Sequence, residues 1–303
     1  MDAELTRLAE RQGGLLVCSQ VREHGLDTTT LRRWAMAGEV VRLTRGLYAL
    51  ATHRETTAEG RHLQLARGAL LLMPDAVLSH WTALLAHGVP VLGVPRMVRL
   101  RRPIHRQVRH GAFLVDPWRG EPVRTDLGDA VPVGQAILEQ SRLRGLEAGL
   151  VSADAALHSK AVSTDALAEQ ASQLKGPGAR VARRTAALAD GRVESVGESR
   201  LRYACVVGGV EVIPQATIRT HDGEFVARVD FLVKDTNVVL EFDGRVKYAD
   251  GDGRTLWNEK NREDALRRLG YVVVRVTWDD LANPAEILER IRKASHHTRA
   301  AAG

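Results

Sequence analysis

Residues 224–243 form the segment that most restricts how this chain can fold. Their sequence, EFVARVDFLVKDTNVVLEFD, has two runs of β-branched and apolar residues around the four residues KDTN. This pattern predicts a β-hairpin with a four-residue loop. If Val233 pairs with Val238, then Asp230 lies directly opposite Glu241. The alternation of side chains along a strand places one apolar set on a single face: Val229, Phe231, Val233, Val238, Leu240 and Phe242.

The other face of the predicted hairpin collects three acids, Asp230, Glu241 and Asp243. Like charges directly opposite each other destabilise a sheet by up to about 1 kcal/mol, and burial drives one of them to take a proton. A divalent cation removes this penalty, and Mg²⁺ prefers one or two carboxylates together with water and phosphate oxygens. We therefore expect Mg²⁺ or Mn²⁺ at Asp230 and Glu241. The alternative is a solvated cluster in which Arg228 and Lys247 neutralise the acids.

The elements around this hairpin follow an order that is typical of one nuclease fold. A helix over 197–207 carries Glu198, and the hairpin precedes a helix around 258–269 and an apolar strand over 271–276. Helix, hairpin, helix and strand in this order form the core of the PD-(D/E)XK fold. The segments ESRLR, RVDFLV, VVLEFDG and EKNREDALRRLGYVVVRVTWDDL resemble nuclease-like domains related to very-short-patch-repair endonucleases, over about residues 192–295. The resemblance implies a metal-dependent attack of water on a DNA phosphodiester.

The same resemblance implies roles for individual residues of this chain. Asp230 would be the principal metal ligand, and Glu241 the second, directly or through water. Glu198 would be an outer acid on the preceding helix, with Gln215 supporting the site. The apolar neighbours of Glu241 also predict that its strand lies inside the sheet, where a charged face is more typical of a cleft than of open surface.

One position departs from the family pattern. The motif usually ends in a lysine two residues after the second acid, and this chain has Asp243 there. Lys247, or Lys260 on the next helix, could supply the missing ammonium group. On that helix, Lys260 or Arg262 could face the cleft and contact phosphate, although ordinary charge pairs along the helix are the preferred expectation for most of it. The candidate catalytic set is Glu198, Asp230, Glu241, Asp243 and Lys247.

The first 52 residues predict three short helices followed by a hairpin. Glycines end the three helical stretches, and Ser19 and either Asp27 or Thr28 are suited to cap the second and third. The hairpin turns at Thr44-Arg45-Gly46. This layout is typical of a winged helix-turn-helix. The stretch QGGLLVCSQVREHGLDTTTLRRWAMAGEVVRLTRGLYAL resembles the N-terminal winged helix of type IV (abortive-infection) antitoxins, which implies binding to promoter DNA and repression of its own operon.

The third helix and the hairpin carry the residues suited to DNA. Side chains of the helix would meet base edges and phosphates, and those of the hairpin would meet the backbone. The alternatives are a solvated surface or a protein-binding winged helix. DNA is favoured because these elements carry arginine without an acidic neighbour until Glu39. The expected DNA-binding residues here are Thr28, Thr29, Arg32, Arg33, Arg42 and Arg45.

The middle region, 53–190, predicts a mixed α/β domain. Its apolar helix beginning at SHWTA resembles the second domain of the same antitoxins. An arginine-rich run follows, in which Arg99 and Arg101 alternate with apolar residues. These two arginines could extend the phosphate-binding surface. An ordinary solvated sheet face is the equally weighted alternative.

Composition limits the remaining classes. Of 303 residues, 43 are basic and 37 acidic, and the net charge of +6 permits a nucleic-acid partner. Two cysteines exclude a disulfide scaffold and a cysteine-rich zinc site. The polar N-terminus and the short apolar runs indicate neither a signal peptide nor a membrane span, so a cytoplasmic location is expected. We predict an α+β multidomain chain: a winged helix over 1–52, a middle domain over 53–190 and an α/β restriction-endonuclease-like core over 191–303.

Two functions are open on these grounds. The leading expectation is a protein that binds double-stranded DNA and cuts it with a Mg²⁺-dependent endonuclease-like domain. The alternative, motivated by Asp243 in place of lysine, is a non-catalytic transcriptional repressor or antitoxin of a type IV toxin–antitoxin or phage-defence system. Its partners would be a cognate toxin and, through the nuclease-like fold, a second copy of the chain as a homodimer.

Overall fold

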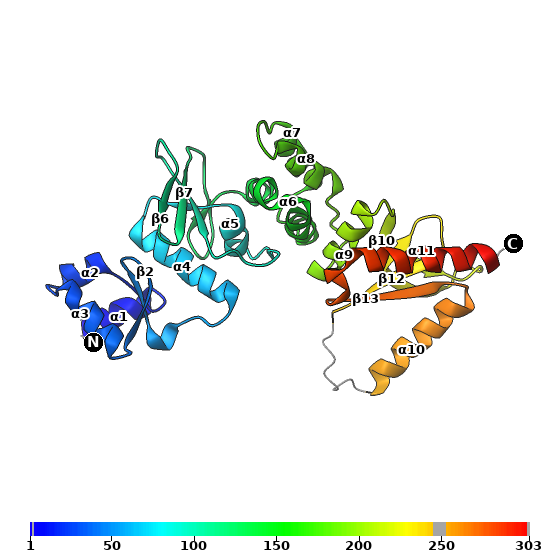
Figure 1. Cartoon of the computed structure of the whole chain (residues 1–303), viewed down its shortest axis with the longest axis horizontal. Coiled ribbons are helices and arrows are strands. Elements are labelled where there is room, and N and C mark those ends of the chain that lie inside the picture. Colours follow the sequence, from blue (N-terminus) through cyan, green and yellow to red (C-terminus); the bar gives the residue numbers. More distant parts are fainter. Residues whose placement is uncertain (2, 245–252, 302–303) are drawn as a thin grey trace. The chain divides into compact units, whose positions relative to one another are not determined.

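The computed structural model describes residues 1, 3–244 and 253–301 and divides the chain into two compact units (Figure 1). The first unit comprises Met1–Gly145 and Asp165–Arg183, and the second comprises Leu146–Thr164 and Arg184–Gly303. Helices and strands alternate irregularly in both, as expected for an α+β chain. In the part of the chain that the structure describes, no helix is both long and apolar enough for a transmembrane segment.

The N-terminal part of the first unit contains three helices and a three-stranded sheet. The strands pair antiparallel in the order β1-β3-β2, and the helices pack on them around buried Leu5, Val21 and Leu31. Gly46 has a φ of 81° in the turn of the hairpin, which confirms the predicted turn. The elements are α1 (Ala3–Arg11), β1 (Leu15–Val17), α2 (Cys18–Glu23), α3 (Thr28–Met36), β2 (Val40–Thr44) and β3 (Leu47–Leu50).

The starts of α2 and α3 show how the helix caps form. Asp27 caps α3, because its Oδ1 accepts a hydrogen bond from the Thr29 amide at 3.0 Å. The prediction that Ser19 caps the second helix is wrong. β1 runs directly into α2, which begins one residue before Ser19, and the side chain of Gln20 reaches back to accept from the Val17 amide at 3.1 Å.

The rest of the first unit is built on a six-stranded mixed sheet with the order β6-β7-β5-β4-β9-β8. Helices α4 and α5 follow the N-terminal hairpin, and α6, α7 and α8 follow the sheet along the chain. The second unit takes over within α6 after Gly145 and within α8 after Arg183. The elements are η1 (Ala51–His53), α4 (Ala58–Leu72), β4 (Val77–Leu78), α5 (His80–Ala86), β5 (Val98–Arg102), β6 (Val108–His110), β7 (Phe113–Pro117), β8 (Val123–Arg124), β9 (Asp129–Ala130), α6 (Val133–His158), α7 (Thr164–Ser172) and α8 (Ala179–Leu188).

The second unit has a four-stranded sheet in the order β10-β11-β12-β13, antiparallel except for the parallel pair β12–β13. The expected order of helix, hairpin, helix and strand is confirmed, and the hairpin loop covers 234–237 as predicted. The elements are α9 (Val196–Val207), β10 (Val212–Arg219), β11 (Phe225–Val233), β12 (Val238–Asp243), α10 (Gly253–Arg268), β13 (Val272–Thr277), η2 (Asp280–Ala282) and α11 (Pro284–Ala301).

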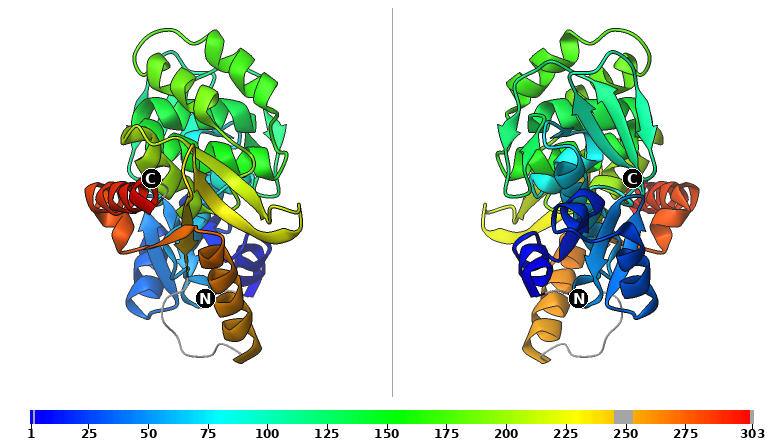
Figure 2. Two further views of the ribbon diagram at one scale, coloured as in Figure 1. Left: turned by 90° about the vertical axis from the view of Figure 1, so that its right-hand side faces the viewer. Right: turned by 90° about the vertical axis from the view of Figure 1, so that its left-hand side faces the viewer.

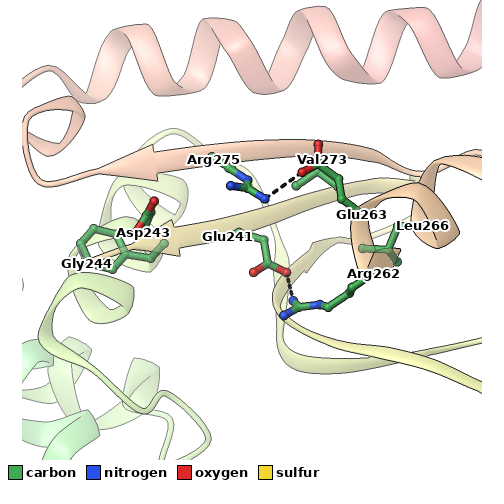
Figure 3. A pocket seen from close by; sticks show the side chains of 9 residues that line it. Glu241, Asp243, Gly244, Arg262, Glu263, Leu266, Val273 and Arg275 are labelled. Atoms are coloured by element: carbon green, nitrogen blue, oxygen red, sulfur yellow. Dashed lines mark hydrogen bonds and ion pairs between the residues drawn. The ribbon is translucent and has the colours of Figure 1, made fainter. Parts of the chain in front are cut away.

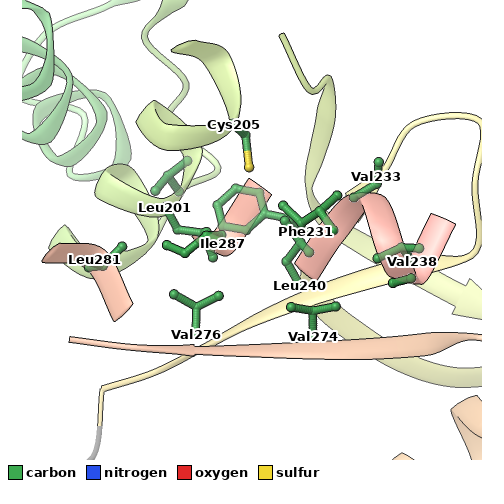
Figure 4. Close-up of a cluster of buried hydrophobic side chains, with 13 residues drawn as sticks. Leu201, Cys205, Phe231, Val233, Val238, Leu240, Val274, Val276, Leu281 and Ile287 are labelled. Carbon is green, nitrogen blue, oxygen red and sulfur yellow. The ribbon is translucent and has the colours of Figure 1, made fainter. Parts of the chain in front are cut away.

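Apolar side chains cover both faces of this sheet. One cluster joins the sheet to α9 and α11 through Phe231, Leu240 and Ile287 (Figure 4). The other joins it to α10 through Val239 and Leu266, and Figure 2 shows α10 and α11 on different sides of β13. This second cluster buries a sheet face that carries acids at one end.

The prediction that Val229 shares the face of Phe231 is wrong. Val229 packs in the cluster with Val239 and Leu266 instead. The change of face falls next to Asp230, opposite Gln215, whose φ of 53° interrupts the extended backbone of β10.

Candidate functional site

Asp230 and Glu241 face each other on neighbouring strands. The observed pairs Phe231–Leu240 and Leu232–Val239 have the predicted register, and its continuation sets Asp230 opposite Glu241. β12 lies between β11 and β13, so the prediction of an inner strand is confirmed. Both carboxylates are half-buried, and Asp230 Oδ2 accepts a hydrogen bond from the Phe242 amide at 2.7 Å.

The pKa values of both acids are raised. Burial is the main cause at Asp230, where the Phe242 amide opposes the shift and the charge of Glu198 adds to it. Burial is also the main cause at Glu241, where Arg262 lowers the pKa and Asp230 raises it. Burial and mutual repulsion thus disfavour the state in which both groups are ionised. A positive charge nearby favours the ionised state of both groups.

Arg262 of α10 supplies such a charge. Its Nη2 donates to Glu241 Oε1 in an ion pair (Figure 3). Arg275 lies beside Glu241 in the β12–β13 register but pairs with Glu263 at 2.7 Å. Among the described residues, the cation paired with Glu241 is therefore Arg262, on the same helix as the candidate Lys260.

Of the other cations named from the sequence for this site, only Arg228 has a described side chain, and it pairs elsewhere. Arg228 forms two hydrogen bonds, of 2.9 and 3.0 Å, with Glu194, and Lys247 lies outside the described residues. Lys260 belongs to α10, but its side chain is not described. Asp243 ends β12 opposite Thr277. The position that holds lysine in the resembling nucleases is thus acidic and at the end of the inner strand.

Glu198 is buried at the start of α9. The side chain of Ser195 caps this helix by accepting from the Glu198 amide at 3.1 Å. Glu198 Oε2 accepts from Gln215 Nε2 and from the Glu194 amide, both at 3.0 Å. Gln215 therefore contacts Glu198, as expected, and Glu198 also stabilises the helix N-terminus.

A pocket of about 260 Å³ opens on the charged end of the inner strand (Figure 3). Glu241 and Asp243 line it together with Arg262 and Arg275, whereas Asp230 and Glu198 are not among its described lining residues. Within the described ranges, no three His, Cys, Asp or Glu side chains are grouped so that they could hold a metal ion. The structure thus offers an opposed pair of acids beside a pocket.

The residues expected to bind DNA in the N-terminal part are largely at the surface. Thr29, Arg32 and Arg33 are exposed on α3, whose other side buries Leu31. Arg42 and Arg45 are exposed in the hairpin. Thr28 begins α3, but its side chain is not described.

The expected phosphate-binding role of Arg99 and Arg101 must be corrected. Arg99 is only 8% exposed and pairs with Asp116 at 2.6 Å. Arg101 is largely buried and pairs with Glu139 at 2.6 Å. His80, whose pKa falls to about 2 because of burial, accepts from Arg99 Nη2 across 3.1 Å. These arginines are neutralised inside the unit, because β7 and α6 bring Asp116 and Glu139 beside the inner strand β5.

Comparison with known proteins gives one informative match. Residues 3–51 match the family described as "Transcriptional regulator, AbiEi antitoxin". No curated protein sequence matches the chain. A solved structure, "Homing Endonuclease I-Bth0305I Catalytic Domain", matches with 17% identity and a TM-score of 0.26, over 34% of this chain and 95% of that one. The N-terminal segment is therefore similar to antitoxin-type transcriptional regulators, as its sequence predicts.

Proposed function

We propose that the chain is a DNA-binding transcriptional regulator of the antitoxin type, with residues 1–52 acting as a winged helix. The observation that carries the proposal is the two-sided character of α3. Thr29, Arg32 and Arg33 are exposed on it while Leu31 is buried below. The family match over residues 3–51 supports the same function.

The exposed side of α3 has the chemistry of a recognition helix. An arginine can form two hydrogen bonds with the O6 and N7 atoms of guanine in the major groove. The hairpin arginines, Arg42 and Arg45, are suited to phosphate contacts that set the orientation of the protein on the duplex. The arginines of α3 would then recognise the base sequence, and those of the hairpin would contribute affinity for the DNA backbone.

The test is footprinting of the DNA that precedes the gene. We expect the full chain to protect one site at moderate salt, and Arg32→Ala/Arg33→Ala to abolish this protection. Arg11→Ala, an exposed arginine at the end of α1, is the matched control and should protect as the wild type does. Failure of the wild type to protect any site would overturn the proposal.

A second candidate function is Mg²⁺-dependent hydrolysis of DNA phosphodiesters at Asp230 and Glu241. The observation that favours it is the opposed, half-buried pair with raised pKa values. Two carboxylates suit Mg²⁺, which otherwise keeps water and phosphate oxygens as ligands. Asp230 and Glu241 would hold the ion, and the ion would act as a Lewis acid on the phosphodiester. Arg262 would then release Glu241 and be available to a phosphate oxygen.

This second function lacks an identified base. A guanidinium stays protonated in proteins and cannot take a proton from water, so Arg262 and Arg275 do not replace the family lysine. The test is plasmid cleavage with Mg²⁺ or Mn²⁺ by the wild type and Asp230→Asn. The control is Asp235→Asn in the exposed hairpin loop, where a φ of 58° also suits asparagine. Equal residual cutting by the wild type and Asp230→Asn would identify a contaminant and refute this function.

A further inference from the structure

We propose that α8 carries a second DNA contact, in which Arg180, Arg183 and Arg184 bind backbone phosphates regardless of sequence. All three side chains are exposed. Their spacing of three and four residues places them on one side of the helix. This contact is separate from operator reading by α3 and does not depend on it.

The charge on this face has no acidic partner in the part of the chain that the structure describes. The sequence has no acid between Glu169 and Asp190, and among the described residues the side chains of Arg180 and Arg184 form no ion pair or hydrogen bond. Arg183 donates to the Leu174 carbonyl at 2.7 Å, a contact that leaves its charge uncompensated. Like charges at these spacings repel each other and destabilise a helix, so an external anion would stabilise α8.

The other side of α8 shows why the arginines stay at the surface. Ala182, Thr185 and Ala186 are buried there and anchor the helix to the protein. The arginines are thus held on a fixed outer face, next to the exposed Lys175 of the preceding turn.

Duplex DNA is the anion that this face fits best. It carries one negative charge per about 1.7 Å of helix axis, so a compact set of three cations can meet several phosphates. Arginine forms two parallel hydrogen bonds with a phosphate, which adds geometry to the charge attraction. An acidic protein surface is the other class of anionic partner, and the experiment below separates the two.

The test is fluorescence anisotropy of the full chain with a labelled duplex of mixed sequence unrelated to its promoter, over a salt series. Each phosphate-bound arginine contributes about 0.9 to the slope of log Kobs against log salt concentration. We expect Arg180→Ala/Arg183→Ala/Arg184→Ala to flatten the slope by about 2–3 and to weaken binding about tenfold at low salt. Arg180→Ala/Arg184→Ala, which leaves the Arg183 bond intact, should lose about two thirds of that slope.

Two matched variants define the outcome. The triple arginine-to-lysine variant keeps the charges and should keep the slope. A triple alanine variant at Arg124, Arg192 and Arg292, which are exposed but paired with Asp129, Asp190 and Glu289, should bind as the wild type does. If the α8 triple alanine variant keeps the wild-type slope, the face serves an acidic protein or solvent and the proposal is overturned. Because the unrelated duplex reports only sequence-independent binding, this result is distinct from a failure of operator recognition.

Discussion

Two segments of this chain, β5 and α8, both carry clustered arginines, but the arginines have opposite structural roles. In β5, Arg99 and Arg101 meet Asp116 and Glu139, which come from other elements of the unit. On α8, Arg180 is exposed and has no acidic partner among the described residues. A cationic run in a sequence therefore does not identify a cationic surface. The burial of the element and the acids of its spatial neighbours decide the outcome.

The largest expected effect would come from breaking the buried group. Arg99→Ala leaves Asp116 as a buried charge without its partner, and losing one member of a buried pair costs about 3–5 kcal/mol. We expect this loss in the free energy of unfolding of the first unit, measured by urea denaturation. If the Arg99→Ala variant had the same free energy of unfolding as the wild type, the arginines of β5 would be as solvated as those of α8. The contrast between the two groups would then be wrong.

The next effect concerns operator binding. Arg32→Ala should weaken binding to the protected promoter site by about 1–3 kcal/mol if the arginine contacts a base, measured by anisotropy with that site. Binding to an unrelated duplex should change much less, unlike the effect of the α8 variant. If Arg32→Ala weakened binding to both duplexes equally, Arg32 would contact phosphates regardless of sequence, as proposed for Arg180.

A smaller effect is expected at the acid pair, and it depends on pH. Because the pKa of Asp230 is raised in the folded state, the native protein binds more protons than the unfolded chain, and stability falls as pH rises from about 4 upward. Asp230→Asn should therefore raise stability at neutral pH by about 0.5–1 kcal/mol and leave it unchanged below about pH 4. Urea unfolding at both pH values measures this, and destabilisation at neutral pH would contradict the assigned shift.

The smallest effect belongs to α8. Arg180→Ala/Arg184→Ala should alter the free energy of unfolding by no more than about 0.5 kcal/mol, with a slight gain from relieved repulsion. Thermal unfolding of this variant beside Arg99→Ala compares the two groups directly. A loss as large as that of Arg99→Ala would mean that α8 arginines hold the fold together and are not available to DNA.

The local structure of the candidate site was predictable from the residues alone. The alternation of apolar and charged residues and the loop KDTN together specify one register, because a shift by one residue would turn the apolar side chains to the other face. The structure has that register, with Asp230 opposite Glu241. The three short helices and the hairpin of the N-terminal part are likewise local, since glycines and cap residues mark their ends.

The partners of the charged groups were not predictable in this way. Glu241 meets Arg262 on α10, and Arg99 meets Asp116 on β7. Arg262 stands in a segment rich in both acids and bases, and such a segment favours ion pairs along the helix. The sequence therefore gave little reason to choose its pairing with Glu241. The sequence also did not show the face of Val229, which changes beside the positive φ of Gln215 in the neighbouring strand.

By itself, the sequence determined the helices and strands of the first 52 residues and of the C-terminal sheet, which acids oppose each other in the hairpin, and that the first 52 residues have the pattern of a DNA-binding helix and wing. Only the tertiary structure decided which charges are neutralised and which remain at the surface. The physical reason is the distance along the chain over which each effect acts. Turn chemistry and side-chain alternation act over a few residues, whereas an ion pair depends on which distant elements the fold brings within about 4 Å of each other.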